Sequence, residues 1–554
     1  MRLSLSVVDA SSLPVGRGRS TAALVALPVE PLADTATSAD ASDASSDGAV
    51  LRPIAWTLPE PLVTEVTHLL RDLRGAGGAG TIRHLPRPTR DPVHVLLYGT
   101  GDGGLRAWRE AGAALVRAAD ERFTTLAVAL PDAAALDRAA LDGAAPDQEE
   151  GSALDGPDAI AKIAGELALG AWLAAYRFEL PGRTTRRSDA EADKPGLRRI
   201  TLVTAASDVA AARQAVAEAR ALAEAVALAR DLTNTPSAQK SPKWFADRVA
   251  QAAARRPGVT VTVLDEHDLA AAGFGGVLAV GQGSRRPPRF VELSWRPRGA
   301  RTHVVLAGKG ICFDTGGVSL KPLDGMRLMR KDMGAAAAVC ATVLAAADLN
   351  LPVRVTALAP LAENLVSGSA MRPGDVIRHY GGTTTEVLDT DAEGRLVLGD
   401  ALAYATKRLR PDWLIDLATL TGASHVALGK QTAALFSDCR ELAEALRNAG
   451  TEAGEPVWPL PLPDDYVRLL HSDVADLANI ARPAQAGAVV AALYLRELVG
   501  DHRSRWAHID MSAPAWSDRD NGPLVKGATG WGVRLLVAFL RAVASGAVPP
   551  ASEG

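Results

Sequence analysis

Short runs of β-branched and other apolar residues alternate along this chain with longer alanine-rich runs, and this alternation constrains the fold more than any other feature. In the first part of the chain, the apolar runs predict strands over 93–99, 124–130 and 200–205. The alanine-rich runs predict helices over 105–119 and 159–176. Strands that alternate with helices are typical of an α/β domain. We therefore expect a smaller N-terminal α/β domain over residues 1–207.

A long helix should connect this domain to a second one. Residues 208–232 contain no glycine or proline and are rich in alanine, glutamate and arginine, which favour a helix. Because Asn234-Thr235-Pro236 should stop it, we expect a bridging helix over 208–233. Strand and helix patterns then alternate again, which predicts a larger α/β domain over 234–554 with a mixed central sheet flanked by helices.

The elements of the larger domain can be assigned from the same patterns. Strands are expected over 259–264, 289–295, 303–308, 353–360, 385–390 and 412–418. Helices are expected over 334–348 and 395–407. Three polar segments interrupt the N-terminal domain, and we interpret 33–49 as a disordered insertion and 141–158 and 181–196 as loops.

Charge and cysteine content narrow the classes of protein. The 60 basic and 64 acidic residues give a net charge of −4, which argues against a generally nucleic-acid-binding surface. Cys312, Cys340 and Cys439 are widely spaced, so no disulfide framework is expected. The N-terminus lacks a signal-peptide pattern, and the most apolar helical run, 335–347, is shorter than the roughly 20 residues that span a bilayer. We expect a soluble cytoplasmic protein without a membrane segment.

Polar side chains gather where the predicted strands of the larger domain end, which is the edge where open α/β sheets bind ligands. The residues that follow strand ends or precede helices there are Lys309, Asp314, Lys321, Asp332, Asp391, Glu393, Arg395 and Thr419. Four carboxylates with no nearby HExxH or CxxC pattern fit a pair of divalent ions, and a neutral lysine amine can also be a ligand. Spacing alone leaves another interpretation open, because a single Asp in such a place is usually a turn or cap residue.

The segment LDTDAEGRLVLGD, residues 388–400, raises the same question of whether its acidic residues are loop residues or metal ligands. Asp389, Asp391 and Glu393 alternate, and like charges two residues apart share one face of a strand. Either water on a loop or a metal ion must make that repulsion tolerable.

Seven blocks of this chain together resemble the leucyl aminopeptidase (cytosol aminopeptidase) family. Four of them carry the polar residues above: GKGICFDTGGVSLKP (308–322), MRLMRKDMGAAAAV (326–339), TDAEGRLVL (390–398) and LATLTGA (417–423). The others are LARDLTNTP (228–236), WAHIDMSAPAW (506–516) and GATGWGVRLLVAFL (527–540). The resemblance covers about 208–554, whereas the N-terminal region matches only loosely.

This resemblance implies a dinuclear metallo-exopeptidase with manganese or zinc, assembled as a homohexamer, in which residues 234–554 form the catalytic domain. It would release N-terminal amino acids from peptides that have a free N-terminus, by attack of a metal-bridging hydroxide. The implied metal ligands are Lys309, Asp314, Asp332, Asp391 and Glu393, with Asp314 and Glu393 bridging the ions. The implied catalytic pair is Lys321, which stabilises the oxyanion, and Arg395, which holds a bicarbonate-like anion. The implied substrate-binding residues are Met329, Asp389, Thr419, Leu420 and Gly422.

Two residues depart from the family pattern. Asp389 stands where the family usually has Asn, and Ala335 stands where it usually has a second Gly. An Asn side chain can donate a hydrogen bond to substrate, whereas an ionised Asp cannot. These departures bear on substrate preference or rate, since the implied ligands and catalytic pair are intact.

Three alternatives remain open. The enzyme could be a dipeptidase, for example one that cleaves cysteinylglycine, and the sequence does not separate this from a broader aminopeptidase. A DNA-binding regulator with the same fold is disfavoured by the net charge of −4 and the acidic insertion over 33–49. An inactive relative kept for assembly is disfavoured by the intact ligand set.

Overall fold

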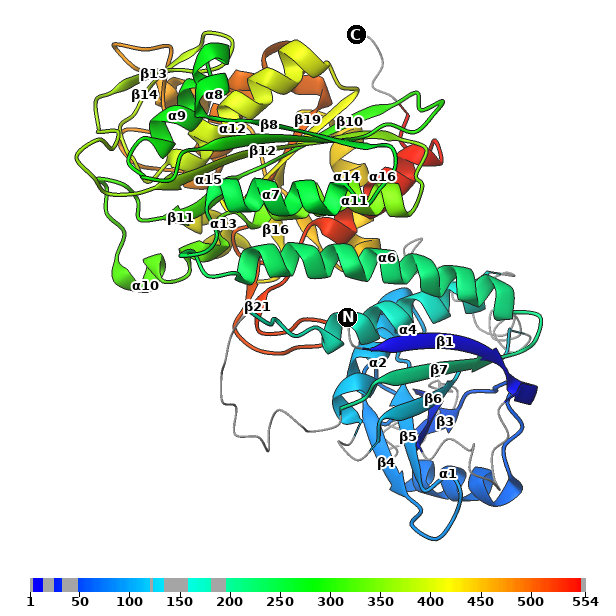
Figure 1. Cartoon of the computed structure of the whole chain (residues 1–554). Coiled ribbons are helices and arrows are strands. Elements are labelled where there is room, and N and C mark those ends of the chain that lie inside the picture. Colours follow the sequence, from blue (N-terminus) through cyan, green and yellow to red (C-terminus); the bar gives the residue numbers. More distant parts are fainter. Residues whose placement is uncertain are drawn as a thin grey trace, which may run out of the picture. The chain divides into compact units, whose positions relative to one another are not determined.

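The computed structural model describes residues 3–12, 24–31, 48–119, 123–133, 158–180 and 196–549 (Figure 1). Apart from a few residues at their ends, the insertion expected over 33–49 and the loops expected over 141–158 and 181–196 lie outside these described residues. In the part of the chain that the structure describes, no helix is both long and apolar enough to cross a membrane.

The chain divides into two compact units, each with its own sheet and helices, so the predicted two-domain α/β fold is confirmed. The first unit comprises Met1–Glu224 and Asp520–Val525, and the second comprises Ala225–Arg519 and Lys526–Gly554. The helix expected between the domains is α6 (Val209–Asn234). The division falls inside this helix, so its first part belongs to one unit and its last part to the other.

The sheet of the first unit has the order β1-β7-β6-β2-β5-β4, with β3 beside β2. Its inner pairs are parallel, whereas β4 and β3 pair antiparallel with β5 and β2. Its strands are β1 (Ser4–Asp9), β2 (Leu24–Pro31), β3 (Ala49–Leu51), β4 (Ile82–Pro86), β5 (His94–Gly99), β6 (Thr125–Ala129) and β7 (Arg199–Thr204). Its helices are α1 (Glu60–Asp72), α2 (Leu105–Ala118) and α4 (Ala159–Ala175). The predicted strands and helices of this unit are therefore confirmed to within a residue or two.

The sheet of the second unit is mixed, as predicted, and has the order β17-β16-β19-β15-β10-β12-β9-β8, with β11 beside β12. The central strands β10, β12, β15 and β19 are parallel and almost wholly buried. The strands are β8 (Val259–Leu264), β9 (Arg289–Trp295), β10 (His303–Gly308), β11 (Gly310–Asp314), β12 (Arg354–Asn364), β15 (Trp413–Ala418), β16 (Ala433–Phe436), β17 (Val457–Pro459) and β19 (Trp506–Asp510). A strand buried on both faces is an apolar run, which is why these strands could be located from sequence.

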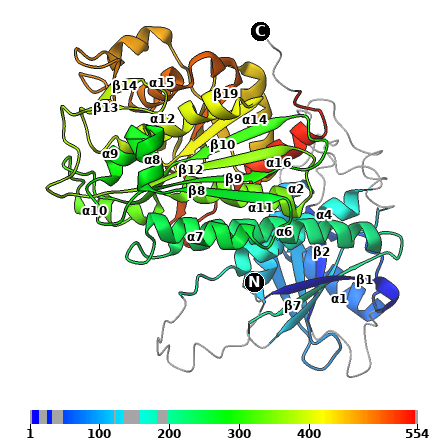
Figure 2. The same cartoon turned by 45° about the horizontal axis from the view of Figure 1, so that its top comes forward.

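Helices cover both faces of this sheet (Figure 1, Figure 2). On one side α11 contacts α7 and α16, and on the other side α12 contacts α9 and α15. The helices are α7 (Pro242–Ala253), α8 (Glu266–Ala272), α9 (Gly275–Gly281), α10 (Leu323–Met326), α11 (Gly334–Asp348), α12 (Glu393–Tyr404), α13 (Gly422–Leu428), α14 (Arg440–Ala453), α15 (Gly487–Val499) and α16 (Val533–Ala544). Ala335, one of the two departures from the family pattern, is fully buried in the first turn of α11.

The strand expected over 385–390 is present only at its start, and its expected extent is wrong. The strand there, β14, spans only Thr384–Glu386 and belongs to a small sheet with β13 (Val376–Arg378) and β18 (Leu477–Ala478). Beyond β14 the backbone amides of Leu388 and Asp389 donate to the Asn479 side chain, at 2.8 and 3.3 Å, instead of to a neighbouring strand. The acidic residues of this segment therefore do not alternate along a strand.

The helix expected over 395–407 begins two residues earlier, at Glu393, and continues past α12 as a single π-helical turn over Ala405–Leu409. Glu393 is consequently the first residue of a helix, where a negative charge interacts favourably with the helix dipole.

Candidate metal centre

The polar residues that follow the central strands of the second unit meet at one edge of the sheet. Lys309 comes directly after β10 and Thr419 directly after β15, and these two strands are parallel neighbours. Asp314 ends β11, which lies along β12. Asp332 precedes α11, and Glu393 begins α12. The strand ends and helix starts thus deliver these side chains to the ligand-binding edge of the sheet.

Three buried carboxylates form the centre of this group. One oxygen each of Asp314, Asp332 and Glu393 lies within 4.8 Å of the others, and all three residues are buried. Three carboxylates at such separations would repel one another strongly in a water-free environment unless cations neutralise them.

The ammonium group of Lys309 supplies part of that positive charge. Its Nζ lies 2.8 Å from Asp332 Oδ2 and 2.8 Å from Glu393 Oε1, and it donates to the carbonyl oxygen of Thr419 at 3.1 Å. A Cβ at position 394 would lie 2.5 Å from Lys309 Cε, so any residue larger than glycine there would displace the Lys309 side chain. The glycine of the TDAEGRLVL block therefore allows Lys309 to reach the carboxylates.

A second ammonium group lies on the other side of Asp314. Lys321 Nζ lies 2.8 Å from Asp314 Oδ2 and also pairs with Asp391 Oδ1. The chain makes room for this contact at Gly316, whose φ is +85° and where a Cβ would lie 2.9 Å from Asp391 Oδ1. Asp391 is the most open of the acidic residues, with 32% of its side chain exposed.

Neighbouring polar side chains hold the carboxylates in place. Asp314 Oδ1 accepts hydrogen bonds from the Gly316 amide and from Asn364 Nδ2, both at 2.8 Å. Thr419 Oγ1 donates to Asp332 Oδ1 at 2.6 Å, so the side chain of Thr419 supports a carboxylate in addition to any backbone contact with substrate. Sequence reasoning missed Asn364, because an Asn at the end of a strand predicts a turn just as readily.

Several carboxylate oxygens in this cluster lack the partners that buried oxygens normally have. Within the described ranges, Asp332 Oδ2, Asp391 Oδ1 and both Glu393 oxygens are buried and accept no hydrogen bond, although three of them lie within ion-pair distance of an ammonium group. Buried polar atoms without partners are costly and point to an ion or ligand. Carboxylate oxygens that converge around only two ammonium groups of the described residues leave acceptor capacity that a divalent cation would use.

The pKa values of the carboxyl groups also indicate that this cluster has an excess of negative charge. Burial, reinforced by the charge of Asp314, raises the pKa of Glu393 to about 8. Burial likewise raises the pKa of Asp391 to about 6 and raises that of Asp332. Burial alone would lower the pKa of Lys309, but the Asp332 and Glu393 carboxylates raise it above its ordinary value. The cluster holds on to protons because it carries an excess of buried negative charge, and the residues present fit bound divalent cations.

Arg395 lies on α12, two residues beyond Glu393, and is also buried. Its Nη1 donates to the carbonyl oxygen of Asn479 at 2.6 Å, whereas its Nε has no hydrogen-bond partner among the described residues. Burial lowers the pKa of the guanidinium. Arg395 can therefore still donate one hydrogen bond to a bound group.

The expected substrate-binding residues lie on three loops of this edge. Met329 begins a short turn, Met329–Lys331, that leads to Asp332. Leu420 is in the loop after β15, where its amide donates to Asp510 Oδ1 at 3.1 Å, and Gly422 begins α13. Asp389 does not join the carboxylate cluster of Asp314, Asp332 and Glu393, because its Oδ1 instead accepts a hydrogen bond from the Asp391 amide at 2.8 Å.

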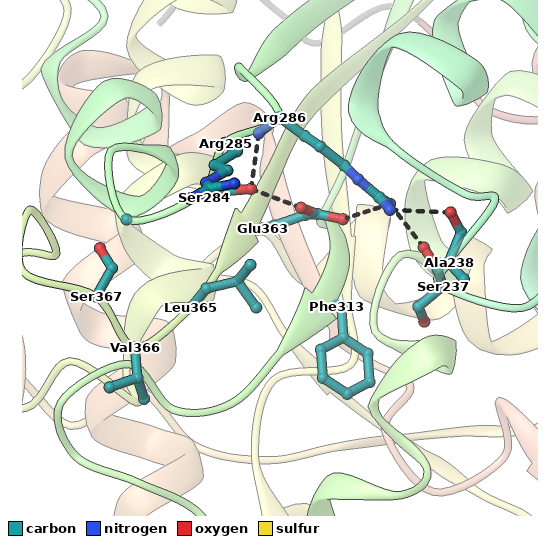
Figure 3. A pocket seen from close by; sticks show the side chains of 11 residues that line it. Ser237, Ala238, Ser284, Arg285, Arg286, Phe313, Glu363, Leu365, Val366 and Ser367 are labelled. Carbon is teal, nitrogen blue, oxygen red and sulfur yellow. Dashed lines mark hydrogen bonds and ion pairs between the residues drawn. The ribbon is translucent and has the colours of Figure 1, made fainter.

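A separate pocket of about 460 Å³ lies beside β11 and β12 (Figure 3). Phe313 and Glu363 line it, and their chain neighbours Asp314 and Asn364 belong to the metal centre, so the two sites use opposite faces of the same strand pair. Glu363 pairs with Ser284 at 2.6 Å and with Arg286 at 3.3 Å, and Arg286 also donates to the carbonyl oxygens of Ser237 and Ala238. Arg286 and Glu363 thus neutralise each other, and Arg285 also lines the pocket.

Known proteins resemble this chain over most of its length. Residues 227–537 match the family described as "Cytosol aminopeptidase family, catalytic domain". A probable cytosol aminopeptidase of Chlorobaculum parvum is 39% identical over 477 residues, which cover 85% of this chain and 91% of that protein. One of Gluconobacter oxydans is 39% identical over 503 residues, covering 91% and 92%. Among solved structures, the bottromycin maturation enzyme BotP is similar with a TM-score of 0.75 and 35% identity, covering 95% of this chain and 100% of BotP, and a second structure of BotP is in complex with Mn.

Proposed function

Because the chain belongs to the cytosol aminopeptidase family and is a metal-dependent aminopeptidase, we propose that the cluster of Asp314, Asp332 and Glu393 is its catalytic metal centre. The observation that carries this proposal is the set of buried carboxylate oxygens that accept no hydrogen bond. No other group of at least three His, Cys, Asp or Glu residues with mutually close ligand atoms occurs in the described part of the chain.

The ligands are Lys309, Asp314, Asp332, Asp391 and Glu393, and together they hold two divalent ions. Bound there, the ions would supply Lewis acidity and a water molecule of lowered pKa for attack on the peptide bond. Lys309 would serve as a neutral amine, because metal binding selects the deprotonated form and the ions take over the neutralising role of its ammonium group. The complex of BotP with Mn favours manganese, and zinc is the alternative.

Lys321 is the residue that stabilises developing negative charge. Burial would lower the pKa of its ammonium group, but Asp314 and Glu393 raise it, so this group stays charged at neutral pH. A fixed cation beside the carboxylates can donate a hydrogen bond to the carbonyl oxygen of the scissile peptide as that oxygen becomes negative. Arg395 can hold a bicarbonate-like anion through its unpartnered Nε.

The substrate class follows from the family: peptides with a free N-terminus. We further propose a homohexamer and a cytoplasmic location, on the family resemblance of the sequence. A dipeptidase acting on a substrate such as cysteinylglycine would use the same centre and differ only in the length of peptide admitted. None of the relatives named above is described as a DNA-binding protein, so the regulator alternative gains no support.

The test combines metal analysis with hydrolysis. Wild-type protein, Asp332→Asn and Glu393→Gln are dialysed against buffered Mn²⁺ or Zn²⁺. Each protein is then assayed on aminoacyl amides and on the same compounds with an acetylated N-terminus. Two ions per chain and cleavage of only the unblocked substrates are expected for the wild type, and both variants should lose metal and activity. Asp348→Asn is the matched control, because Asp348 pairs with Arg256 outside the centre. Full metal occupancy in both cluster variants would refute the assignment.

A further inference from the structure

Asn479 is fully buried and lies directly after β18, about ninety residues from the segment it contacts. Its side-chain oxygen accepts hydrogen bonds from the amides of Leu388 and Asp389, and its Nδ2 donates to the carbonyl oxygen of Asp389 at 2.6 Å. A carboxamide carries the same donor and acceptor groups as a peptide bond. The side chain of Asn479 therefore pairs with the backbone of this segment as a neighbouring strand would.

The backbone groups of Asn479 make two further hydrogen bonds, one to β14 and one to α12. Its amide donates to the carbonyl oxygen of Glu386 at 3.0 Å, which continues the pairing of β14 with β18 by one residue. Its carbonyl oxygen accepts the 2.6 Å hydrogen bond from Arg395 Nη1. One buried residue thus contacts both the end of β14 and the guanidinium on α12.

These contacts lead directly to the metal centre. The Asp389 backbone is held by Asn479, and the Asp389 side chain accepts a hydrogen bond from the amide of Asp391 at 2.8 Å, which restrains the backbone from which the Asp391 carboxylate projects. Residues 387–392 belong to no strand or helix, so side-chain hydrogen bonds hold them: Asn479 and Asp389 supply those described above, and Thr390 is held separately by Ser319, Gly316 and Asn364. A ligand on an irregular segment depends on such support for its geometry.

We propose that Asn479 is a positioning residue of the aminopeptidase reaction, which holds the Asp391 segment and the Arg395 guanidinium in register with each other. This inference rests on the proposed function, because it assigns Asp391 to the metal centre and Arg395 to catalysis. The residue itself contacts neither metal nor substrate in this assignment. Its amide group, and not merely its volume, is what the role requires.

Two variants separate the amide from the volume. Asn479→Ala removes the three side-chain hydrogen bonds and keeps both backbone bonds. Asn479→Asp keeps the shape and the acceptor but turns the donor into a second oxygen facing the Asp389 carbonyl. Asn234→Ala is the control, because Asn234 is also buried and accepts a hydrogen bond from the Ala528 amide at 3.0 Å, outside the metal centre.

Metal affinity, steady-state kinetics, melting temperature and amide exchange of the metal-free protein are measured for all four proteins. In Asn479→Ala we expect faster exchange at Leu388 and Asp389, and in both Asn479 variants we expect about tenfold weaker binding of at least one ion, since partners of metal ligands contribute roughly 10- to 100-fold. At saturating metal, kcat of both Asn479 variants should remain at least fivefold below that of the wild type, while KM should change less than threefold. Asn234→Ala should lower the melting temperature without these effects.

Three results would decide against the inference: metal affinity and kcat within twofold of wild type in both Asn479 variants, full function in Asn479→Asp, or an equal loss of metal affinity in Asn234→Ala. A wild-type protein that binds no metal and hydrolyses no unblocked peptide would overturn the proposed function instead. In that case the amide exchange of the metal-free proteins still decides whether Asn479 holds the segment.

Discussion

Replacing Thr419 by valine removes one hydrogen bond from the metal centre with little change of shape. The hydroxyl of Thr419 donates to Asp332 Oδ1 at 2.6 Å, and both residues are buried. The other oxygen of that carboxylate, Oδ2, accepts no hydrogen bond and faces the ammonium group of Lys309. The hydroxyl therefore anchors one oxygen so that the other is presented to the centre.

The size of the effect follows from the kind of hydrogen bond. A bond from a hydroxyl to a buried carboxylate contributes about 1.5–3 kcal/mol, and every ~1.4 kcal/mol is a factor of ten in affinity. Lys309 still restrains the carboxylate at 2.8 Å, so only part of this free energy should be lost. We expect about tenfold weaker metal binding in Thr419→Val, with a smaller loss of kcat at saturating metal.

The assay is a titration of metal-free protein with buffered Mn²⁺, followed by kcat at saturating metal. Thr419→Ser is the matched control, because serine keeps the hydroxyl and loses only the methyl group. The serine variant should bind metal within threefold of wild type. If valine binds metal as tightly as threonine does, or if serine is as weak as valine, then the hydroxyl does not support Asp332 and the reasoning is refuted.

Three further predictions concern other residues and the metal itself. Burial, with Arg354 nearby, lowers the pKa of His303 to about 3, whereas its ordinary value is about 6.5. Between these two values only the unfolded state takes up the proton, so the free energy of unfolding decreases as the pH is lowered. Between pH 7 and pH 5 the free energy of unfolding, measured with urea, should therefore decrease by about 2 kcal/mol less in His303→Gln than in the wild type. An unchanged pH dependence would contradict this. Asp389→Asn keeps an acceptor for the Asp391 amide, so metal content should be unchanged while turnover or substrate preference shifts; loss of metal would make Asp389 a ligand. Removing metal with a chelator should lower the melting temperature, because it removes a ligand bound to the folded state and leaves Lys309 as the counter-charge of the buried Asp332 and Glu393 carboxylates, and an unaltered melting temperature would show that no ion was bound.

The elements that were predicted well are those whose pattern is set by burial alone. The helix α11, Gly334–Asp348, was located to the residue, because an alanine-rich run without glycine or proline in its interior leaves little alternative to a helix. The strand β10 was located equally well, since a strand covered on both faces must be apolar throughout. The segment after β14 was misassigned, because its hydrogen bonds go to the side chain of a residue far along the chain and local pattern does not record such partners.

The sequence by itself determined the fold class, the two-domain organisation and the chemical character of the site. The motif blocks identify which carboxylates and lysines matter, because a metal centre needs those residue types and few other structures place so many of them at strand ends. Only the tertiary structure decided how they are supported. Asn364, Asn479 and Thr419 act through contacts with residues that lie 50 to 91 positions away in the chain. Amide and hydroxyl side chains occur in turns, in helix caps and in buried hydrogen-bond networks, so only the folded structure shows which of these roles a given residue has.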